Sequence, residues 1–338
     1  MGKFPSRILK KYVFNRLGVR RSDVLVWPGE GIDVAVTSID KDSVLVSHSD
    51  PIVGALKRIG WLAVNIACND VATSGIAPTW ILPTILLPEN WSEDIIDEIT
   101  KDIDIAAKKL NVSVIGGHTG YGGGLLRPIV VVTAMGVGRR DKYIVSSNAR
   151  EGDIVYLTKG AGLEGTAILA SDFRDVLLER GVDEKIINSA EKFIEEISIV
   201  KEALKLAETG AINAMHDATR GGVAEALIEI AVSSGTMIEV WEDKIPLRKE
   251  TKIFADALGF DPLWMISSGT LIFTVSEDDR SIVEDILEDL GILYSQIGVV
   301  KRGKGMVVIH RTGRIEEISH TQPEKDELAR IWKLYPRV

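Results

Sequence analysis

The chain has 338 residues, of which 45% are hydrophobic and 26% are charged, and its formal net charge is −9. This length and composition are typical of a folded protein of two domains and exclude a low-complexity or disordered chain. Basic residues form no stripe along the sequence, which argues against nucleic-acid binding. The basic start is followed by no apolar signal core, and no later stretch approaches the roughly 18 apolar residues of a membrane span. We therefore expect a cytoplasmic protein with no membrane or nucleic-acid partner.

Cys68 is the single cysteine of the chain, which excludes an intrachain disulfide and a zinc site built from cysteines. It lies in the apolar run LAVNIACNDVA. This setting predicts a small buried core residue rather than a nucleophile.

The first half of the chain predicts a sheet packed against long helices. Residues 34–47 alternate β-branched and polar positions around a turn, as a hairpin does. Residues 54–74 form a long apolar run closed by Gly75 and Pro78, which is typical of a helix with a C-terminal stop. Further predicted elements are strands at 79–87, 112–115 and 129–137 and an amphipathic helix at 92–110.

The polar stretch 138–152 divides the chain into two predicted domains, 1–148 and 149–338, because the periodicity lapses there and resumes as a strand at 153–158. Strands and helices do not alternate strictly in the second domain, so an α+β fold is favoured over a doubly wound parallel sheet. Its further predicted elements are helices near 163–180, 184–209, 220–234 and 278–290 and strands near 237–241, 270–275 and 306–310.

The string KGAGLEGT at 159–166 has two interpretations. Its G-x-G-x-x-G spacing between a strand and a helix suggests a dinucleotide site. That fingerprint usually opens a parallel βαβ unit, however, and the residues that follow here predict helix. A tight strand-to-helix turn is therefore favoured. A P-loop does not fit, because no lysine precedes Thr166.

Four aspartates stand in glycine-rich or turn-like surroundings: Asp33, Asp50, Asp70 and Asp217. Carboxylates in such places are suited to Mg²⁺, which prefers oxygen ligands and bridges nucleotide phosphates. Taken singly, each has a plainer alternative. Asp33 and Asp50 could cap turns, and Asp70 could be a solvated residue near a helix end.

Two glycine-containing segments are candidates for anion binding. Thr219, Arg220, Gly221 and Gly222 open a strong amphipathic helix, where free backbone N–H groups and the helix dipole favour anions. An ordinary helix cap with a packed glycine pair is the competing interpretation. The run IGGHTGYGGGLLRP at 115–128 is rich in glycine, and because such backbone freedom costs entropy, a ligand contact is plausible there.

Taken in order, these segments resemble the AIR synthase (PurM-like) superfamily over most of the chain, and within it most of all the HypE type of hydrogenase maturation factor. The motifs that carry the resemblance are IGWLAVNIACNDVATSGIAP at 59–78 and DATRGGV at 217–223. Three further segments are similar to family motifs: PGEGIDVAV at 28–36, Ser-Asp-Pro at 49–51 and SSGTLIF at 267–273. Where the family usually has two adjacent aspartates, this chain has Ile32 and Asp33.

The resemblance implies an α+β fold of two domains. The strands of the N-terminal, ATP-binding domain would form a barrel with those of a second subunit, giving a homodimer, and a C-terminal α+β domain would cover it. ATP and Mg²⁺ are the implied cofactors, with the nucleotide in the cleft between the domains.

Matching positions give the implied site residues. The metal ligands would be Asp33, Asp50 and Asp70, and the catalytic residues Asp217, His118 and Arg220. The nucleotide contacts would be Gly29, Gly31, Asp33, Asp50, Asn69, Gly116, Gly117, Thr119, Thr219, Gly221 and Gly222. His118 stands where an acidic residue is common and is similar to the Gly-Gly-His of selenophosphate synthetase.

The implied chemistry is ATP-dependent phosphorylation of an amide- or carboxylate-type oxygen. HypE-type proteins apply it to a group on their own C-terminal cysteine, and Val338 stands here where that cysteine is expected. We therefore expect a substrate from outside, either a small molecule or a group on a partner such as another maturation factor. Two alternatives stay open: a phosphotransferase like thiamine-monophosphate kinase, and an ATP-binding assembly protein without turnover.

Overall fold

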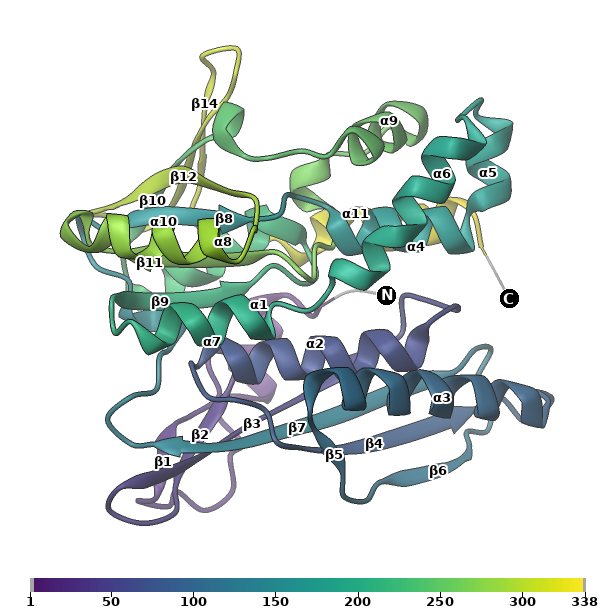
Figure 1. Cartoon of the computed structure of the whole chain (residues 1–338), viewed down its shortest axis with the longest axis horizontal. Helices are drawn as coiled ribbons and strands as arrows, with labels where there is room; N and C mark the ends of the chain where they lie inside the picture. Colours follow the sequence, from purple (N-terminus) through teal and green to yellow (C-terminus); the bar gives the residue numbers. More distant parts are fainter. Residues whose placement is uncertain (1–2, 337–338) are drawn as a thin grey trace.

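The computed structural model describes residues 3–336 and contains two sheets, one from each half of the chain (Figure 1). The first sheet has the strand order β1-β2-β3-β7-β4-β5, with β6 paired to β4. The elements of this half are α1 Ser6–Tyr12, β1 Val24–Val26, β2 Ala35–Ser38, β3 Ser43–Ile52, α2 Ile59–Thr73, β4 Trp80–Leu87, α3 Glu93–Leu110, β5 Ser113–Val114, β6 His118–Tyr121 and β7 Ile129–Arg139.

The first sheet buries only one of its faces. Along β4 and β7 every second side chain is buried, as Ile81 and Val132 are, because successive side chains of a strand point to opposite faces. The helices α2 and α3 lie over this face (Figure 1). On the other face Leu82 and Val131 are only half-buried, and Val137 is 43% exposed. The described chain thus leaves an apolar sheet face uncovered.

The helix α2 is enclosed on all sides, and each of its 15 residues is buried. One side packs on β3, β7 and α3, and the other meets α7 and β9 of the second half (Figure 1). A helix in such a place must be largely apolar around its circumference, as this helix is except at Asn65, Asn69, Asp70 and Thr73. Cys68 is fully buried in it, which confirms the prediction of a core residue.

The second sheet has the order β14-β13-β10-β12-β8-β11-β9. Its strands are β8 Ile154–Thr158, β9 Ile212–Asp217, β10 Met237–Trp241, β11 Leu271–Val275, β12 Tyr294–Lys301, β13 Gly305–Ile309 and β14 Ile315–Ile318. The helices of this half are α4 Leu163–Asp172, α5 Arg174–Glu179, α6 Glu184–Glu191, α7 Val200–Glu208, α8 Gly222–Ser234, α9 Lys249–Leu258, α10 Arg280–Asp289 and α11 Glu327–Leu334.

The central strands of the second sheet are buried on both faces. Tyr156 of β8 belongs to the core shared with α7 and α10, whereas Leu157 belongs to the core shared with α8. Tyr156 stacks on Phe273 of the neighbouring strand, with ring centroids 5.2 Å apart. This two-sided burial explains why the strands read as continuous apolar runs. The sheets and helices together form the predicted α+β fold of two domains.

The helix predicted over 184–209 is wrong in one respect, because the structure breaks it into α6, a 3₁₀ turn at Lys192–Glu196 and α7. Backbone carbonyls at the break accept hydrogen bonds from side chains instead of from the following helical turn. Lys159 donates to the carbonyls of Glu196 and Ser198, and Asn69 donates to that of Ile197.

The strand-to-helix turn predicted for 159–166 is confirmed. Lys159, Gly160 and Gly162 all have positive φ, at 60°, 141° and 72°, and α4 starts at Leu163. The strand before the turn, β8, pairs antiparallel with both of its neighbours. The segment therefore lacks the parallel βαβ setting of a dinucleotide fingerprint.

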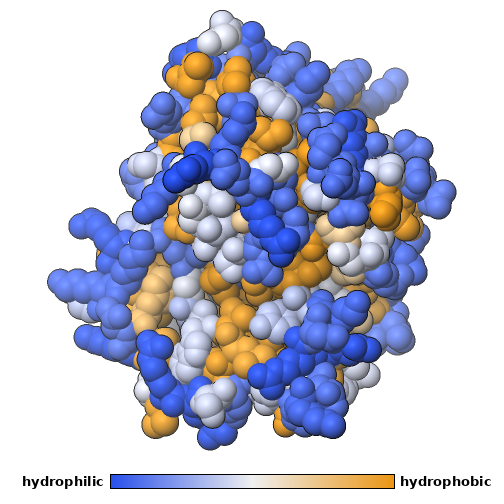
Figure 2. Space-filling model, turned by 90° about the vertical axis from the view of Figure 1, so that its left-hand side faces the viewer, coloured by the Kyte–Doolittle hydropathy of each residue, from blue (hydrophilic) through white to orange (hydrophobic). Residues whose placement is uncertain are grey.

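Within residues 3–336, none of the helices combines the length and the apolar character needed to cross a bilayer. Polar side chains cover most of the face shown in Figure 2, and apolar groups show between them mainly across its middle and lower parts.

Candidate metal and nucleotide site

Asp33, His216 and Asp217 form a cluster at the junction of the two halves. Asp33 ends the loop before β2, and the other two residues end β9. One ligand atom from each lies within 4.8 Å of the others, which is close enough to share a metal ion. His216 and Asp217 are buried, and 13% of the Asp33 side chain is exposed.

Both carboxylate oxygens of Asp217 are buried and have no hydrogen-bond partner in the described chain. Burial, and next the Asp33 carboxylate, raise the pKa of Asp217 to about 7. An orphaned buried carboxylate is costly unless a cation or a proton satisfies it. Asp217 and Asp33 therefore fit Mg²⁺, which takes oxygen ligands.

Two further predicted metal ligands lie beside this cluster. Asp70 is on the last turn of α2, and its Oδ2 is buried without a hydrogen bond, 3.4 Å from His48 Nε2. Burial, then the carboxylates of Asp217 and Asp33, raise the pKa of Asp70 well above its usual range. Burial also raises the pKa of Asp50 on β3, against the opposing charge of His48. Four carboxylates thus converge from the two halves of the chain.

A chain of ion pairs runs from this cluster to the start of the polypeptide. His216 Nδ1 lies 2.8 Å from Asp33 Oδ2, and His216 Nε2 lies 3.0 Å from Glu229 Oε2. Glu229 Oε1 in turn lies 2.8 Å from Lys3 Nζ. Burial alone would lower the pKa of His216, but its pairs with Asp33 and Glu229 raise it to about 10. Against the effect of its burial, Lys3 and His216 lower the pKa of Glu229 to about 2.

Two adjoining cavities border Asp33, Asp50, Asp70 and Glu229, whereas the buried His216 and Asp217 line neither of them. The metal chamber, of about 550 Å³, is lined by Asp33, Asp50, Asp70, Glu229 and the loop from Gly29, among others. The apolar chamber, of about 360 Å³, is lined by Ile52, Ile66, Ile266 and Leu328, with polar groups from Glu164, Arg220 and Ser268. The two chambers adjoin at four residues that line both of them, and we call this border the passage: Lys3, Phe4, Asp50 and Thr219.

The polar groups of the apolar chamber are poorly satisfied. Glu164, only 2% exposed, accepts a long hydrogen bond of 3.3 Å from the Ser268 N–H. Its burial raises the pKa of Glu164 to about 7. The Ser268 hydroxyl is buried with no partner in the described chain. Buried polar groups of this kind are suited to a polar substrate head.

The predicted glycines near the cleft allow close backbone approaches. A Cβ on Gly31 (φ +72°) would lie 2.3 Å from the Glu229 carbonyl oxygen. A Cβ on Gly222 (φ +66°) would lie 2.5 Å from the carbonyl oxygen of Met265, and Gly221 also has positive φ. These glycines bring the loop at 29–33 and the start of α8 to the cleft.

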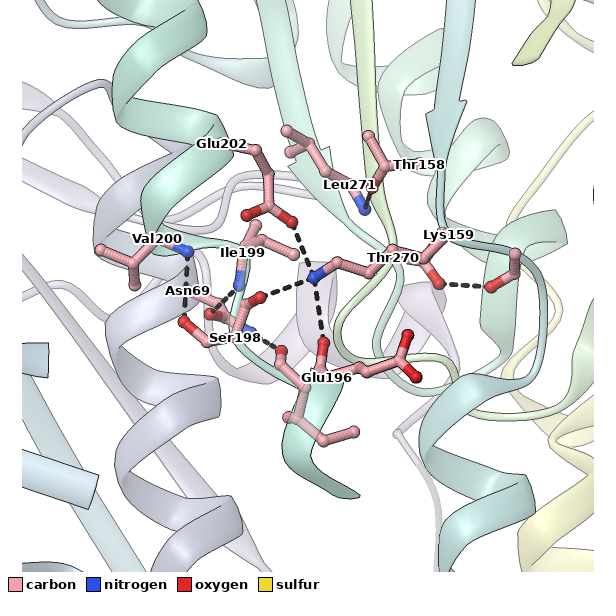
Figure 3. A network of polar contacts seen from close by, with 12 residues as sticks. Asn69, Thr158, Lys159, Glu196, Ser198, Ile199, Val200, Glu202, Thr270 and Leu271 are labelled. Carbon is pink, nitrogen blue, oxygen red and sulfur yellow. Dashed lines mark hydrogen bonds and ion pairs between the residues drawn. The ribbon is translucent and has the colours of Figure 1, made fainter. Parts of the chain in front are cut away.

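Asn69 has a different setting from the other predicted nucleotide contacts, because its side chain joins the two halves of the chain. Its amide donates to the Ile197 carbonyl at 2.9 Å and accepts from the Ile199 N–H at 2.9 Å. Figure 3 shows the same segment held by Lys159, whose ammonium lies 2.7 Å from Glu202 Oε1. Asn69 is not among the residues that line either chamber.

The predicted residues Gly116, Gly117, His118 and Thr119 also lie outside these chambers. They line a separate depression of about 340 Å³ with Pro83, Ile85 and residues of α3. This depression is at the β6 edge of the first sheet. Within the single described chain, His118 is therefore not brought to the carboxylate cluster.

Several residues of the site were not singled out from the sequence. They are His48, His216, Glu229, Glu164 and Lys3. His216 directly precedes the predicted Asp217, so two ionisable residues side by side at the end of a strand were a usable signal. Glu229 stands two turns into an apolar helix, and its role depends on which face of α8 meets the cleft.

Two family models match the chain: the N-terminal domain of AIR synthase related proteins over residues 31–138, and the C-terminal domain of these proteins over residues 150–311. The chain belongs to the family of AIR synthase related proteins. It is 34% identical over 263 residues to a hydrogenase expression/formation protein of Methanocaldococcus jannaschii, covering 76% of this chain and 74% of that protein. A thiamine-monophosphate kinase of Pyrococcus abyssi is 28% identical over 263 residues, covering 77% of this chain and 76% of the kinase.

Solved structures show the same fold. A HypE–HypF complex contains a chain that matches with a TM-score of 0.72 at 21% identity, covering 93% of this chain and 99% of that one. HypE in complex with ATP matches with a TM-score of 0.69 at 22% identity, covering 94% of this chain and 95% of that one.

Proposed function

We propose that this protein is an Mg-ATP-dependent enzyme that phosphorylates an amide- or carboxylate-type oxygen, as a HypE-like member of its family. The observation that carries the proposal is the convergence of the Asp33 and Asp217 carboxylates beside His216, where the buried Asp217 oxygens have no partner in the described chain. Asp33 and Asp217, with Asp50 and Asp70 close by, would hold Mg²⁺, which would supply compensation for negative charge on the nucleotide phosphates. The similarity to HypE, of which an ATP complex is known, supports ATP as the nucleotide.

The chain's own residues divide the remaining work between the two chambers. Thr219 and the backbone N–H groups that open α8 would hold phosphate oxygens at the passage. Arg220 lines the apolar chamber and makes no hydrogen bond or ion pair in the described chain, so its donors are available to an acceptor oxygen. The apolar chamber would take the acceptor and exclude water from the transferred group.

Two wider features belong to the proposal. The open apolar face of the first sheet is suited to a second copy of the chain, and in such a homodimer the glycine-rich run 116–119 would lie close to the partner. A HypE–HypF complex exists among the structural relatives, which supports another maturation factor as a partner. We also propose the division into domains 1–148 and 149–338 and a cytoplasmic location.

The similarity to a thiamine-monophosphate kinase supports a second candidate, transfer of phosphate to a phosphorylated alcohol. The products separate the two. A kinase leaves phosphate on the acceptor, whereas activation of an amide releases phosphate as the acceptor is converted. ATP bound tightly but never turned over, with any acceptor or partner protein, would instead indicate an assembly protein.

The first experiment is calorimetric titration with ATP, with and without Mg²⁺. We expect Mg²⁺-dependent binding that falls at least about tenfold in Asp217→Asn and Asp70→Asn, since each removes a metal-binding charge. Asp141→Asn, an exposed aspartate paired with Arg139, is the matched control and should bind as the wild type does. Sedimentation of the same preparation should give the mass of two chains. Unchanged binding in Asp217→Asn would contradict the metal assignment.

A further inference from the structure

The N-terminal segment 3–14 forms one wall of the metal chamber. Lys3, Phe4, Ser6, Leu9 and Phe14 all line it. The segment is only lightly attached, because α1 contains no buried residue. Two ion pairs hold it to the rest of the chain: Lys3 to Glu229 at 2.8 Å and Lys10 to Glu30 at 2.5 Å.

Lys3 is the single lysine or arginine among the described residues that line the metal chamber, where carboxylates dominate. It also lines the apolar chamber, so Lys3 borders both chambers, and its ammonium group lies 2.8 Å from Glu229, which lines the metal chamber. Arg220, in contrast, lines the apolar chamber alone. A cation at this passage is where the charge of a transferred phosphoryl group needs compensation.

The ammonium group of Lys3 has hydrogen-bond donors left over after its contact with Glu229. An ammonium group has three N–H donors, and one hydrogen bond of Lys3 is found in the described chain, to Glu229 Oε1. Its side chain is 35% exposed. Although burial opposes it, the charge of Glu229 raises the pKa of Lys3 above its ordinary value, so the group keeps its proton.

We propose that Lys3 is a catalytic residue, held in place by Glu229, whose ammonium group contacts the transferred phosphoryl group at the passage between the two chambers. This inference rests on the proposed function. In the reaction the acceptor oxygen forms a bond to the γ-phosphorus of ATP. The bond from that phosphorus to the bridging oxygen breaks, and its electron pair leaves with ADP. Lys3 donates hydrogen bonds to the peripheral phosphoryl oxygens and keeps its own proton.

The experiment compares two ligands of the intact protein, MgADP and MgADP with aluminium fluoride, which imitates the phosphoryl group in transfer. Lys3→Met should weaken binding of the aluminium fluoride complex about 10- to 100-fold, the loss expected for a charge-assisted hydrogen bond. Its affinity for MgADP alone should stay within about twofold, because ADP has no transferred group. Lys3→Arg should restore part of the difference.

Lys10→Met is the matched control. Lys10 forms the other ion pair of the same segment, but it lines neither chamber. This variant should bind both ligands as the wild type does. The inference is overturned if Lys3→Met binds the aluminium fluoride complex as tightly as the wild type, or if it loses both ligands equally. A wild-type protein that binds neither ligand contradicts the proposed function itself, and this is seen before any variant is compared.

Discussion

The buried carboxyl group of Glu164 gives a prediction in which stability and pH are linked. Glu164 is only 2% exposed, and its burial raises its pKa from the ordinary value of 4.5 to about 7. The unfolded chain therefore releases this proton near pH 4.5, whereas the folded chain holds it to about pH 7. As pH rises between these values, the folded state therefore becomes less stable relative to the unfolded state.

At about 1.4 kcal/mol for each pH unit, the full cost above pH 7 is about 3 kcal/mol, and at pH 5 it is below about 1 kcal/mol. Glu164→Gln keeps the shape and an acceptor for the Ser268 N–H but cannot ionise. We expect this variant to be more stable than the wild type by about 3 kcal/mol at pH 8 and nearly equal to it at pH 5.

Urea unfolding at the two pH values, without nucleotide, measures this difference. Glu317→Gln serves as the control, because Glu317 is exposed on β14 and its replacement should change stability by less than about 0.5 kcal/mol at either pH. A Glu164→Gln protein that is equal to or less stable than the wild type at pH 8 would refute the argument from burial.

Two further predictions concern a buried ion pair and a close backbone approach at a glycine. Lys159→Met should lower the free energy of unfolding in urea by about 3 to 5 kcal/mol, because it leaves the buried Glu202 carboxylate without its cation. Lys205→Met is the control: it breaks an exposed pair with Glu208 and should cost less than about 1 kcal/mol. Similar losses in the two variants would contradict the role of burial. Gly222→Ala should destabilise the folded protein by at least about 2 kcal/mol more than Gly235→Ala. Both glycines have positive φ, but of the two only Gly222 has backbone atoms within 4 Å of an added Cβ. Thermal unfolding of the two variants would show it, and equal melting temperatures would contradict it.

The elements with clear periodicity were predictable from sequence. The alternation in 34–47 predicted β2 and the first half of β3, which continues to Ile52. The apolar run in 54–74 predicted the end of α2, which begins only at Ile59. The strand β9 was missed, because nearly all of its residues are buried and it therefore lacks the alternation of a half-exposed strand. The same strand carries His216 and Asp217, so the sequence located the carboxylate of the site but not the element that holds it.

Pairing across the fold was beyond sequence reasoning. The family resemblance implied that Asp33, Asp50 and Asp70 share a metal site, but nothing in the spacing of these residues and Asp217 along the chain showed that they meet. Glu225 and Glu229 stand on α8 among apolar and small residues, and a glutamate on such a helix predicts a solvated position. The contact partners of Glu229 are distant in the sequence: His216 is 13 residues away and Lys3 is 226 residues away.

The packing of α2 explains why the two halves can share one metal site. Asn69 and Asp70 are neighbours on this helix with separate tasks, since Asn69 holds the segment 197–199 and Asp70 faces the metal chamber. The helix also packs directly on β9, which ends at Asp217. The spacing between Asp70 and Asp217 is therefore set by a close-packed core, which resists change. The segment 3–14 is a more weakly packed wall of the same chamber, because α1 has no buried residue and two ion pairs attach the segment to the rest of the chain.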